Sequence, residues 1–203
     1  AENGTFATAD GAMSTTTIQP YAFAKSIKVS DEVLKLSAVN FESEINTIIT
    51  NSMARTILKQ IFNGTGADGQ FTPITSGATA MTVTAFNMTN LQKFALEIMD
   101  KTDNGVILMN PSVYSTLVDG STKKEEVLIK KLLEDKTIEG VPVVLSSYVP
   151  DATGGNYCIG GDLNNYAIGV ANELQITPKQ TAGTLAHTYD ASVYINGKPI
   201  VAG

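Results

Sequence analysis

Residues 27–74 read IKVSDEVLKLSAVNFESEINTIITNSMARTILKQIFNGTGADGQFTPI: a short strand, one long helical segment and then a glycine-rich loop. From Phe41 to Phe62 apolar residues recur at helical spacing, with no glycine or proline between them. The spacing predicts one helix about 33 Å long, which is long for a compact domain of this size. Asn63-Gly64, which follows, is a typical C-terminal signal for that helix.

The glycines at positions 64, 66 and 69 have the spacing of a dinucleotide-binding loop. Such a loop needs a strand before it and a helix after it, so that the pyrophosphate meets the helix N-terminus. Here a helix comes first, residues 71–74 follow with a proline among them, and no Gly-Lys-Ser/Thr closes a phosphate loop. We therefore interpret the glycines as a helix stop followed by a mobile turn.

Composition bounds the class of protein. With 203 residues, 43% of them hydrophobic and 17% charged, the chain is long enough for one large globular domain or two small ones. The sequence contains no run of 18 apolar residues, so it predicts no membrane-spanning helix, and no signal peptide is visible. The net charge of −6 argues against a surface dedicated to nucleic acid, because phosphate contacts need clustered lysine and arginine. The lysines at 123–124 and 130–131 share a predicted helix with acidic residues, so we expect a solvated helix face there.

The N-terminal segment differs from the rest of the chain. Residues 1–17 are small, polar and threonine-rich, which favours an extended arm over a packed element. The sequence begins at Ala1 rather than at methionine, and we interpret it as a processed or truncated product.

Beyond the long helix, the pattern predicts a module of α/β character followed by an all-β region from Pro150 onward, which makes the whole chain α+β. The predicted elements are an edge strand at 18–29, a short capped helix from Ser30, a linker at 76–86, helices at 89–100, from Pro111, and at 123–135, and strands at 106–109, 140–145, 156–159, 166–170, 173–177 and 184–195. We predict a capping box that begins at Thr89, and an inward apolar face formed by Val127, Leu128, Leu132 and Leu133. Asn196-Gly197 predicts a two-residue hairpin turn into a strand at 198–201.

Residues that could carry chemistry are few. The only histidine, His187, lies near Asp190 and Ser192, but strand alternation places residues 187 and 190 on opposite faces, so we expect a solvated strand histidine and no hydrolase triad. Cys158 lies in an apolar run, which favours a buried, inert thiol, and a single cysteine excludes an internal disulfide framework.

Asp68, Asp151 and Asp162 lie in glycine-rich turns, where aspartate is common. Calcium binding there stays open as an alternative, although none of these turns matches the twelve-residue calcium loop. We predict no catalytic, cofactor or metal residue, and no enzyme.

Several segments in order resemble the tailed-bacteriophage major capsid proteins. They are the strand and helix entry IQPYAFAKSIKVSDEVL, the long helix, the loop NGTGADGQFTPI, Val106–Pro111 (VILMNP), Gly140–Val144 (GVPVV) and Gly160–Asp162. Residues 72–74 depart from the Pro-x-Gly usual in the family, and the match covers about residues 18–170.

The resemblance implies a tailed-phage major capsid fold, in which the long helix is the spine of a peripheral lobe with long β-strands. That lobe would comprise residues 17–71 and 177–203, an axial α/β lobe would comprise 72–176, and residues 1–16 would be an extended arm, the remnant of a long β-hairpin.

The resemblance also implies a function. The chain would be a virion shell subunit, assembling in the bacterial cytoplasm with copies of itself as hexamers and pentamers. Scaffold or portal proteins would be further partners, packaged DNA would be contacted only non-specifically, and there would be no membrane partner. We expect this chain, which lacks the further N-terminal portion that family members carry, to form monomers or small oligomers rather than closed shells. An encapsulin-like bacterial compartment that encloses enzyme cargo is the alternative within the same fold.

Overall fold

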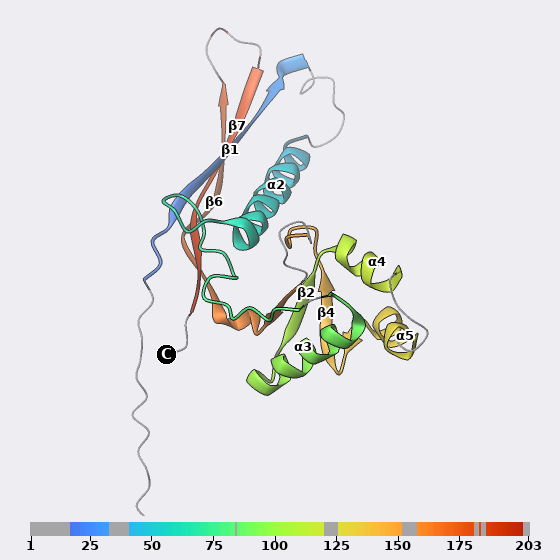
Figure 1. The fold of residues 1–203 in the computed structure, drawn as a ribbon. Coiled ribbons are helices and arrows are strands. Elements are labelled where there is room, and N and C mark those ends of the chain that lie inside the picture. Colours follow the sequence, from blue (N-terminus) through green and yellow to red (C-terminus); the bar gives the residue numbers. More distant parts are fainter. Residues whose placement is uncertain are drawn as a thin grey trace, which may run out of the picture.

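The computed structural model describes residues 17–32, 41–83, 85–119, 126–151, 158–180, 183 and 186–200. These residues form two units, each with its own sheet and its own hydrophobic core (Figure 1). We call them the three-stranded unit (β1, α2, β6, β7) and the four-stranded unit (α3, β2, α4, α5, β3, β4, β5).

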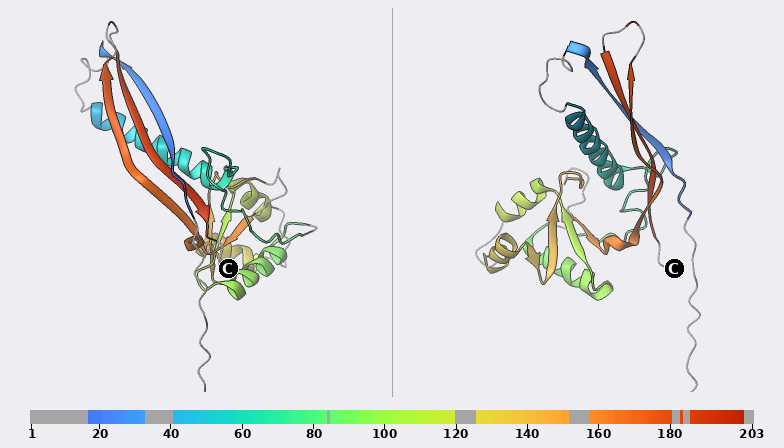
Figure 2. Two further views of the ribbon diagram at one scale, coloured as in Figure 1. Left: turned by 90° about the vertical axis from the view of Figure 1, so that its left-hand side faces the viewer. Right: turned by 180° about the vertical axis from the view of Figure 1, so that it is seen from behind.

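The three-stranded unit is built on long antiparallel strands in the order β1-β7-β6. Their bounds are Tyr21–Ser30 for β1, Tyr166–Gln180 for β6 and Ala186–Pro199 for β7. Figure 2 shows these strands as a long blade that projects past the helices of the other unit. β1 is an edge strand that Pro20 precedes, as predicted.

β6 is one strand where the sequence predicted two. It pairs with β7 from Tyr166 to Gln180, and register shifts at Val170/Asn172 and Asn172/Gln175 interrupt the alternation. A bulge of this kind keeps a strand continuous while it breaks the period-two pattern, which explains why the sequence suggested a gap.

Helix α2 spans Phe41–Asn63 and confirms the predicted long helix. Its buried side chains Ile45, Ile49 and Met53 recur every four residues, so they form one stripe along the helix. That stripe packs on the odd-numbered face of β7, where Tyr189, Ala191, Val193 and Ile195 are buried. The core of this unit therefore lies between the spine-like helix and the blade.

The four-stranded unit is a mixed sheet in the order β3-β4-β2-β5 with helices packed on it. The bounds are α3 Met88–Lys101, β2 Val106–Met109, α4 Pro111–Asp119, α5 Glu126–Asp135, β3 Thr137–Ile138, β4 Val141–Leu145 and β5 Cys158–Gly161. A short 3-10 helix, Leu163–Asn165, leads into β6. The core residues come from all three helices and from β2, β3 and β4. The proline-initiated helix and the strands predicted at 106–109 and 140–145 are confirmed.

Two details of the helices differ from the prediction. The N-cap of α3 is Asn87, whose side chain accepts a hydrogen bond from the Asn90 amide at 2.9 Å, so the capping box predicted from Thr89 is wrong. Leu133 was predicted to face inward but is 51% exposed, whereas Leu132 is buried as predicted. The side chains of residues 127 and 128, and most of the short helix predicted from Ser30, lie outside the described residues.

The hairpin turn predicted at Asn196-Gly197 is wrong as well. β7 runs straight through these residues, which pair with Gly169 and Ile168 of β6. The tight turn of the sheet region lies instead at Glu139-Gly140, between β3 and β4, where both residues have positive φ (49° and 86°). Close packing requires a glycine at position 197, because a Cβ there would lie 2.5 Å from Tyr166 Oη and 2.7 Å from Phe71 Cδ2.

Candidate assembly surfaces

The glycine loop after α2 is a closed turn. The Gly64 amide donates to Gln60 O at 2.8 Å, the Gly66 amide donates to Phe71 O at 2.9 Å, and Gln70 Oε1 accepts from both the amide and the hydroxyl of Thr65. A Cβ at Gly64 would lie 2.2 Å from Phe71 O, so this glycine allows the chain to fold back on the helix end. We expected a mobile turn, whereas hydrogen bonds hold this one closed, and it is not a phosphate cradle.

Phe71 anchors that turn in the core of the three-stranded unit. Its side chain is fully buried and meets Phe23 edge to face, with ring centroids 5.5 Å apart. The next residue, Thr72, donates its amide to Gly197 O at 3.0 Å and accepts from the Tyr166 hydroxyl at 2.8 Å. Burial raises the pKa of Tyr166 to about 12, so the hydroxyl keeps its proton and stays a donor.

Further hydrogen bonds connect the two units. Asn63 Nδ2, at the end of α2, donates to Tyr148 O at 3.0 Å in the four-stranded unit. The Ile74 amide donates to Ile61 O at 2.8 Å, where the chain leaves the three-stranded unit. Both contacts lie at the base of the blade and support its position relative to the four-stranded unit.

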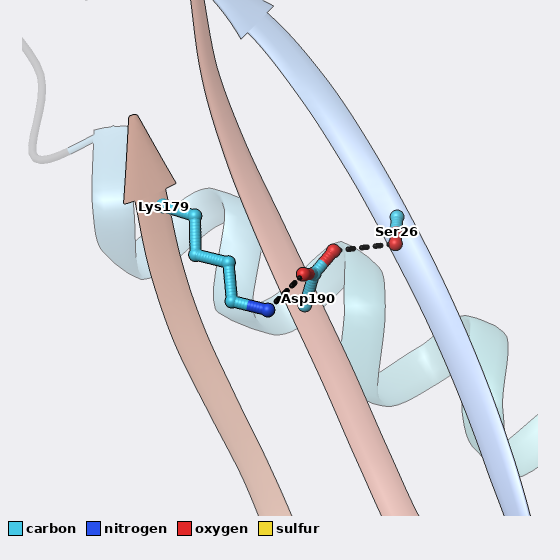
Figure 3. A network of polar contacts seen from close by, with 3 residues as sticks. All are labelled: Ser26, Lys179 and Asp190. Atoms are coloured by element: carbon cyan, nitrogen blue, oxygen red, sulfur yellow. Dashed lines mark hydrogen bonds and ion pairs between the residues drawn. The ribbon is translucent and has the colours of Figure 1, made fainter. Parts of the chain in front are cut away.

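The residues that sequence reasoning considered for catalysis do not come together. His187 Nε2 lies 2.8 Å from Asp31 Oδ1 and is only partly exposed, so it is a paired histidine rather than a solvated one. Asp190 lies on the other face of β7, as predicted, between Ser26 of β1 and Lys179 of β6 (Figure 3). The Ser26 hydroxyl and the Lys179 ammonium, 2.5 and 2.9 Å away, lower the pKa of Asp190. This network ties the three strands together across the outer face of the blade.

The remaining candidates have local roles. Asp68 accepts a hydrogen bond from the Tyr21 hydroxyl at 3.1 Å, which raises the pKa of that tyrosine, and Asp162 accepts from the Asn164 amide at 2.9 Å. Burial raises the pKa of the Cys158 thiol to about 12, which disfavours the nucleophilic thiolate. Within the described residues, no three His, Cys, Asp or Glu side chains group closely enough to hold a metal ion.

Two hollows lie among the described residues. One of about 310 Å³ lies between the two units and is lined by Val106, Leu108, Tyr166 and Ile200 among others. Another, of about 490 Å³, is lined by Thr75, Phe86, Phe94 and Cys158 among others. Burial alone raises the pKa values of Tyr166 and Cys158, and it moves both further from pH 7. Neither side chain therefore suits general acid–base catalysis near pH 7.

Both units leave large apolar side chains exposed. The largest exposed fraction is 56%, at Val170 on the edge strand β6. The others are Ile48 and Leu58 on α2, Leu96 and Met99 on α3, Leu133 on α5, Val144 and Leu145 on β4, Leu163, Ile168, Tyr194 and Ile200. Exposed apolar side chains spread over two units, together with edge strands on both sides of the blade, are typical of a subunit that contacts several neighbours. Sequence periodicity could not separate these residues from core residues, because it identifies the apolar face of a helix or strand but not whether another element packs against that face.

No helix in the described part of the chain is long and apolar enough to cross a membrane.

Comparison with known proteins gives this architecture a family. The model of the phage capsid family matches residues 1–200. The chain belongs to the phage capsid family. It is a structural subunit of a capsid shell, as the sequence resemblance predicted, and a component of the virion.

Solved structures share the fold at low sequence identity. The capsid of a native GTA particle, with C5 symmetry, matches with a TM-score of 0.66 and 16% identity, covering 98% of this chain and 78% of that one. A structure from Microbacterium phage Oxtober96 has a TM-score of 0.66 and 13% identity, covering 97% and 74%. An encapsulin complex from Synechococcus elongatus PCC 7942 has a TM-score of 0.58 and 12% identity, covering 90% and 71%. A search of curated protein sequences returned no match.

Proposed function

We propose that this capsid subunit builds an icosahedral head, as hexamers and pentamers, that encloses the double-stranded DNA of a phage or prophage. The observation that carries the proposal is the family match over residues 1–200, on a subunit with two separate cores. The exposed apolar side chains and open edge strands supply contact surfaces for copies of the chain. A symmetric shell needs several different contacts from each subunit, and a two-unit molecule can provide them.

The two units then act as the two lobes of a capsid subunit. The four-stranded unit, residues 72–165, is the axial lobe, and residues 17–71 with 166–203 form the peripheral lobe. We place the second boundary at 166 instead of 177 because β6 begins at Tyr166 and pairs with β7 from its first residue. Residues 1–16, which lie outside the described residues, would be the N-terminal arm.

The head would hold its DNA without gripping it. The net charge of −6 gives the wall little affinity for phosphate, which suits dense packaging and later release. Assembly would take place in the bacterial cytoplasm, with scaffold and portal proteins as further partners of the shell.

An encapsulin-like compartment is the second candidate. The similarity to the Synechococcus encapsulin complex supports it, because the same fold there carries a different function. The two candidates differ in contents: a phage head holds DNA, whereas a compartment of that type holds cargo protein.

Both candidate functions can be tested on particles purified from cells that carry the gene. They would be purified on a density gradient, treated with nuclease, and analysed for protein by mass spectrometry and for protected nucleic acid. A phage head requires this chain as the dominant protein together with nuclease-resistant DNA. An enzyme enclosed without DNA would favour the compartment, and absence of the chain from every particle fraction would refute both.

Solution scattering tests the two-lobed shape separately. A compact globule of 203 residues has a radius of gyration near 17 Å. The isolated subunit should exceed that value clearly because the blade projects from the four-stranded unit (Figure 2). A value at the compact figure would contradict the proposed lobes.

A further inference from the structure

Four Asn-Gly pairs occur in the sequence, and the structure places three of them in different surroundings. They are Asn63-Gly64, Asn104-Gly105 and Asn196-Gly197, whereas Asn3-Gly4 lies outside the described residues. An asparagine side chain cyclises when the next amide nitrogen attacks its carbonyl carbon, and a following glycine favours the reaction because it has no Cβ in the way. Attack requires the backbone to leave its regular conformation, so local structure controls the rate.

In the Asn63-Gly64 pair, hydrogen bonds hold both groups that would have to react. The Asn63 side-chain nitrogen donates to Tyr148 O at 3.0 Å, and the Gly64 nitrogen donates to Gln60 O at 2.8 Å. Gly64 is also buried against the Phe71 carbonyl. The nucleophile and the side chain are therefore both engaged elsewhere.

Asn196-Gly197 is held by the sheet. Asn196 pairs with Gly169 in β6, and its side-chain nitrogen donates to Gln19 O at 2.7 Å. The Gly197 amide donates to Asn196 Oδ1 at 2.8 Å, so the groups are close, but Gly197 O accepts from the Thr72 amide at 3.0 Å. Strand pairing and burial on both sides keep this backbone extended.

Asn104-Gly105 lies in an exposed turn between α3 and β2. The Asn104 side chain is exposed, and the Asn104 amide makes a long hydrogen bond to Thr102 Oγ1 at 3.3 Å. Among the described residues, the Gly105 amide has no hydrogen-bond acceptor. The glycine itself is imposed by packing, since a Cβ at position 105 would lie 2.2 Å from Ile98 Cγ2.

We propose that Asn104 is a site of spontaneous deamidation. The Gly105 nitrogen loses its proton and bonds to the Asn104 side-chain carbonyl carbon, the side-chain nitrogen leaves as ammonia, and a five-membered succinimide forms. Water then opens the ring at either carbonyl and leaves aspartate or isoaspartate at position 104. No oxidant, metal or enzyme takes part.

The reaction changes the charge of one end of the four-stranded unit. Asn104 shares a hollow of about 430 Å³ with Asp103, Glu139, Met99 and Pro142. Conversion adds a third carboxylate to this surface, beside two carboxylates and exposed apolar side chains. Aged subunits therefore present a more negative surface there than newly made ones.

The test compares the three pairs within one molecule. The folded 203-residue chain is incubated at neutral pH and body temperature, digested, and analysed by peptide mass spectrometry at intervals. The Asn104 peptide should convert more than about tenfold faster than the Asn63 and Asn196 peptides, because those two require local unfolding first. The same incubation in concentrated urea should bring the three rates together, which shows that the fold causes the difference.

One variant sharpens the result. Asn104→Gln should remove the fast conversion, since glutamine would have to close a larger ring, while the Asn63 and Asn196 peptides of the same variant keep their slow rates. An Asn104 peptide that converts as slowly as the Asn196 peptide in the folded chain would overturn the proposal. Equal rates for all three pairs without urea would overturn it too.

Discussion

Replacing Gly197 with alanine tests the packing role assigned to it. The added Cβ would lie 2.5 Å from Tyr166 Oη, 2.7 Å from Tyr166 Cε1 and 2.7 Å from Phe71 Cδ2. Overpacking a well-packed site costs about 1–3 kcal/mol. Displacing the Tyr166 hydroxyl from Thr72 O costs about 1 kcal/mol more. Alanine recovers about 0.5–1 kcal/mol of strand entropy, so the net loss should be about 2 kcal/mol.

Calorimetry of the isolated subunit gives the readout. For a chain of this size a loss of about 2 kcal/mol lowers the Tm by roughly 4–8 °C. Replacing a glycine with positive φ in a turn by alanine would also lower the free energy of unfolding. The size of the loss alone therefore does not distinguish a packing role from turn geometry. The distinction comes from a double-mutant cycle with Tyr166→Phe, which removes the hydroxyl nearest to the new Cβ.

The cycle should give a coupling of about 1 kcal/mol between Gly197→Ala and Tyr166→Phe, because the second change relieves part of the clash. Gly69→Ala is the matched control: Gly69 has a φ of 81° and open space around its Cβ position, so its cost is backbone strain. Its effect should add to Tyr166→Phe with no coupling. Strict additivity for Gly197→Ala would refute the packing account.

Three further predictions concern the four-stranded unit. Asn87→Ala should lower the free energy of unfolding by about 1 kcal/mol through loss of the α3 cap, and Thr89→Ala should change it by less than half of that in urea titrations. Lys136→Gly should raise it by about 1 kcal/mol, because Lys136 has a φ of 50°, and an unchanged urea midpoint would contradict the strain. Cys158 should react slowly with iodoacetamide at pH 8 in the folded chain and rapidly in urea; its raised pKa of about 12 means that the folded rate climbs only as the pH rises toward that value, and equal rates at pH 8 would contradict the burial.

The elements that the sequence predicted well are those whose signals are local. α2 has its apolar stripe every four residues and an Asn-Gly stop, and α4 has proline at its first position. These signals depend on the backbone of a few neighbouring residues, so a single sequence contains them. The order of such segments was also enough to predict the capsid family, which the family match over residues 1–200 confirms.

The sequence predictions were wrong where the role of a residue depends on a contact with residues far away in the sequence. Asn196-Gly197 has the composition of a hairpin turn, but its glycine makes room for Phe71 and Tyr166, which are remote in sequence. The true hairpin at Glu139-Gly140 places a glutamate at a φ of 49°, which turn statistics disfavour. Leu133 continues the apolar stripe of the predicted helix, but it is 51% exposed, because periodicity does not show how much of a helix face its neighbours cover.

The base of the blade controls what the tip can reach. β6 spans 15 residues, so at about 3.3 Å per residue the strand is roughly 50 Å long. A tilt of about 5° at its base would move the tip by about 4 Å, which is as large as a contact distance between apolar atoms. The packing of Gly64, Phe71, Tyr166 and Gly197 lies at this base, next to the Asn63–Tyr148 hydrogen bond between the units. Substitutions there that leave the subunit folded should therefore disturb assembly more than equally destabilising changes in the middle of the core, such as at Ile49.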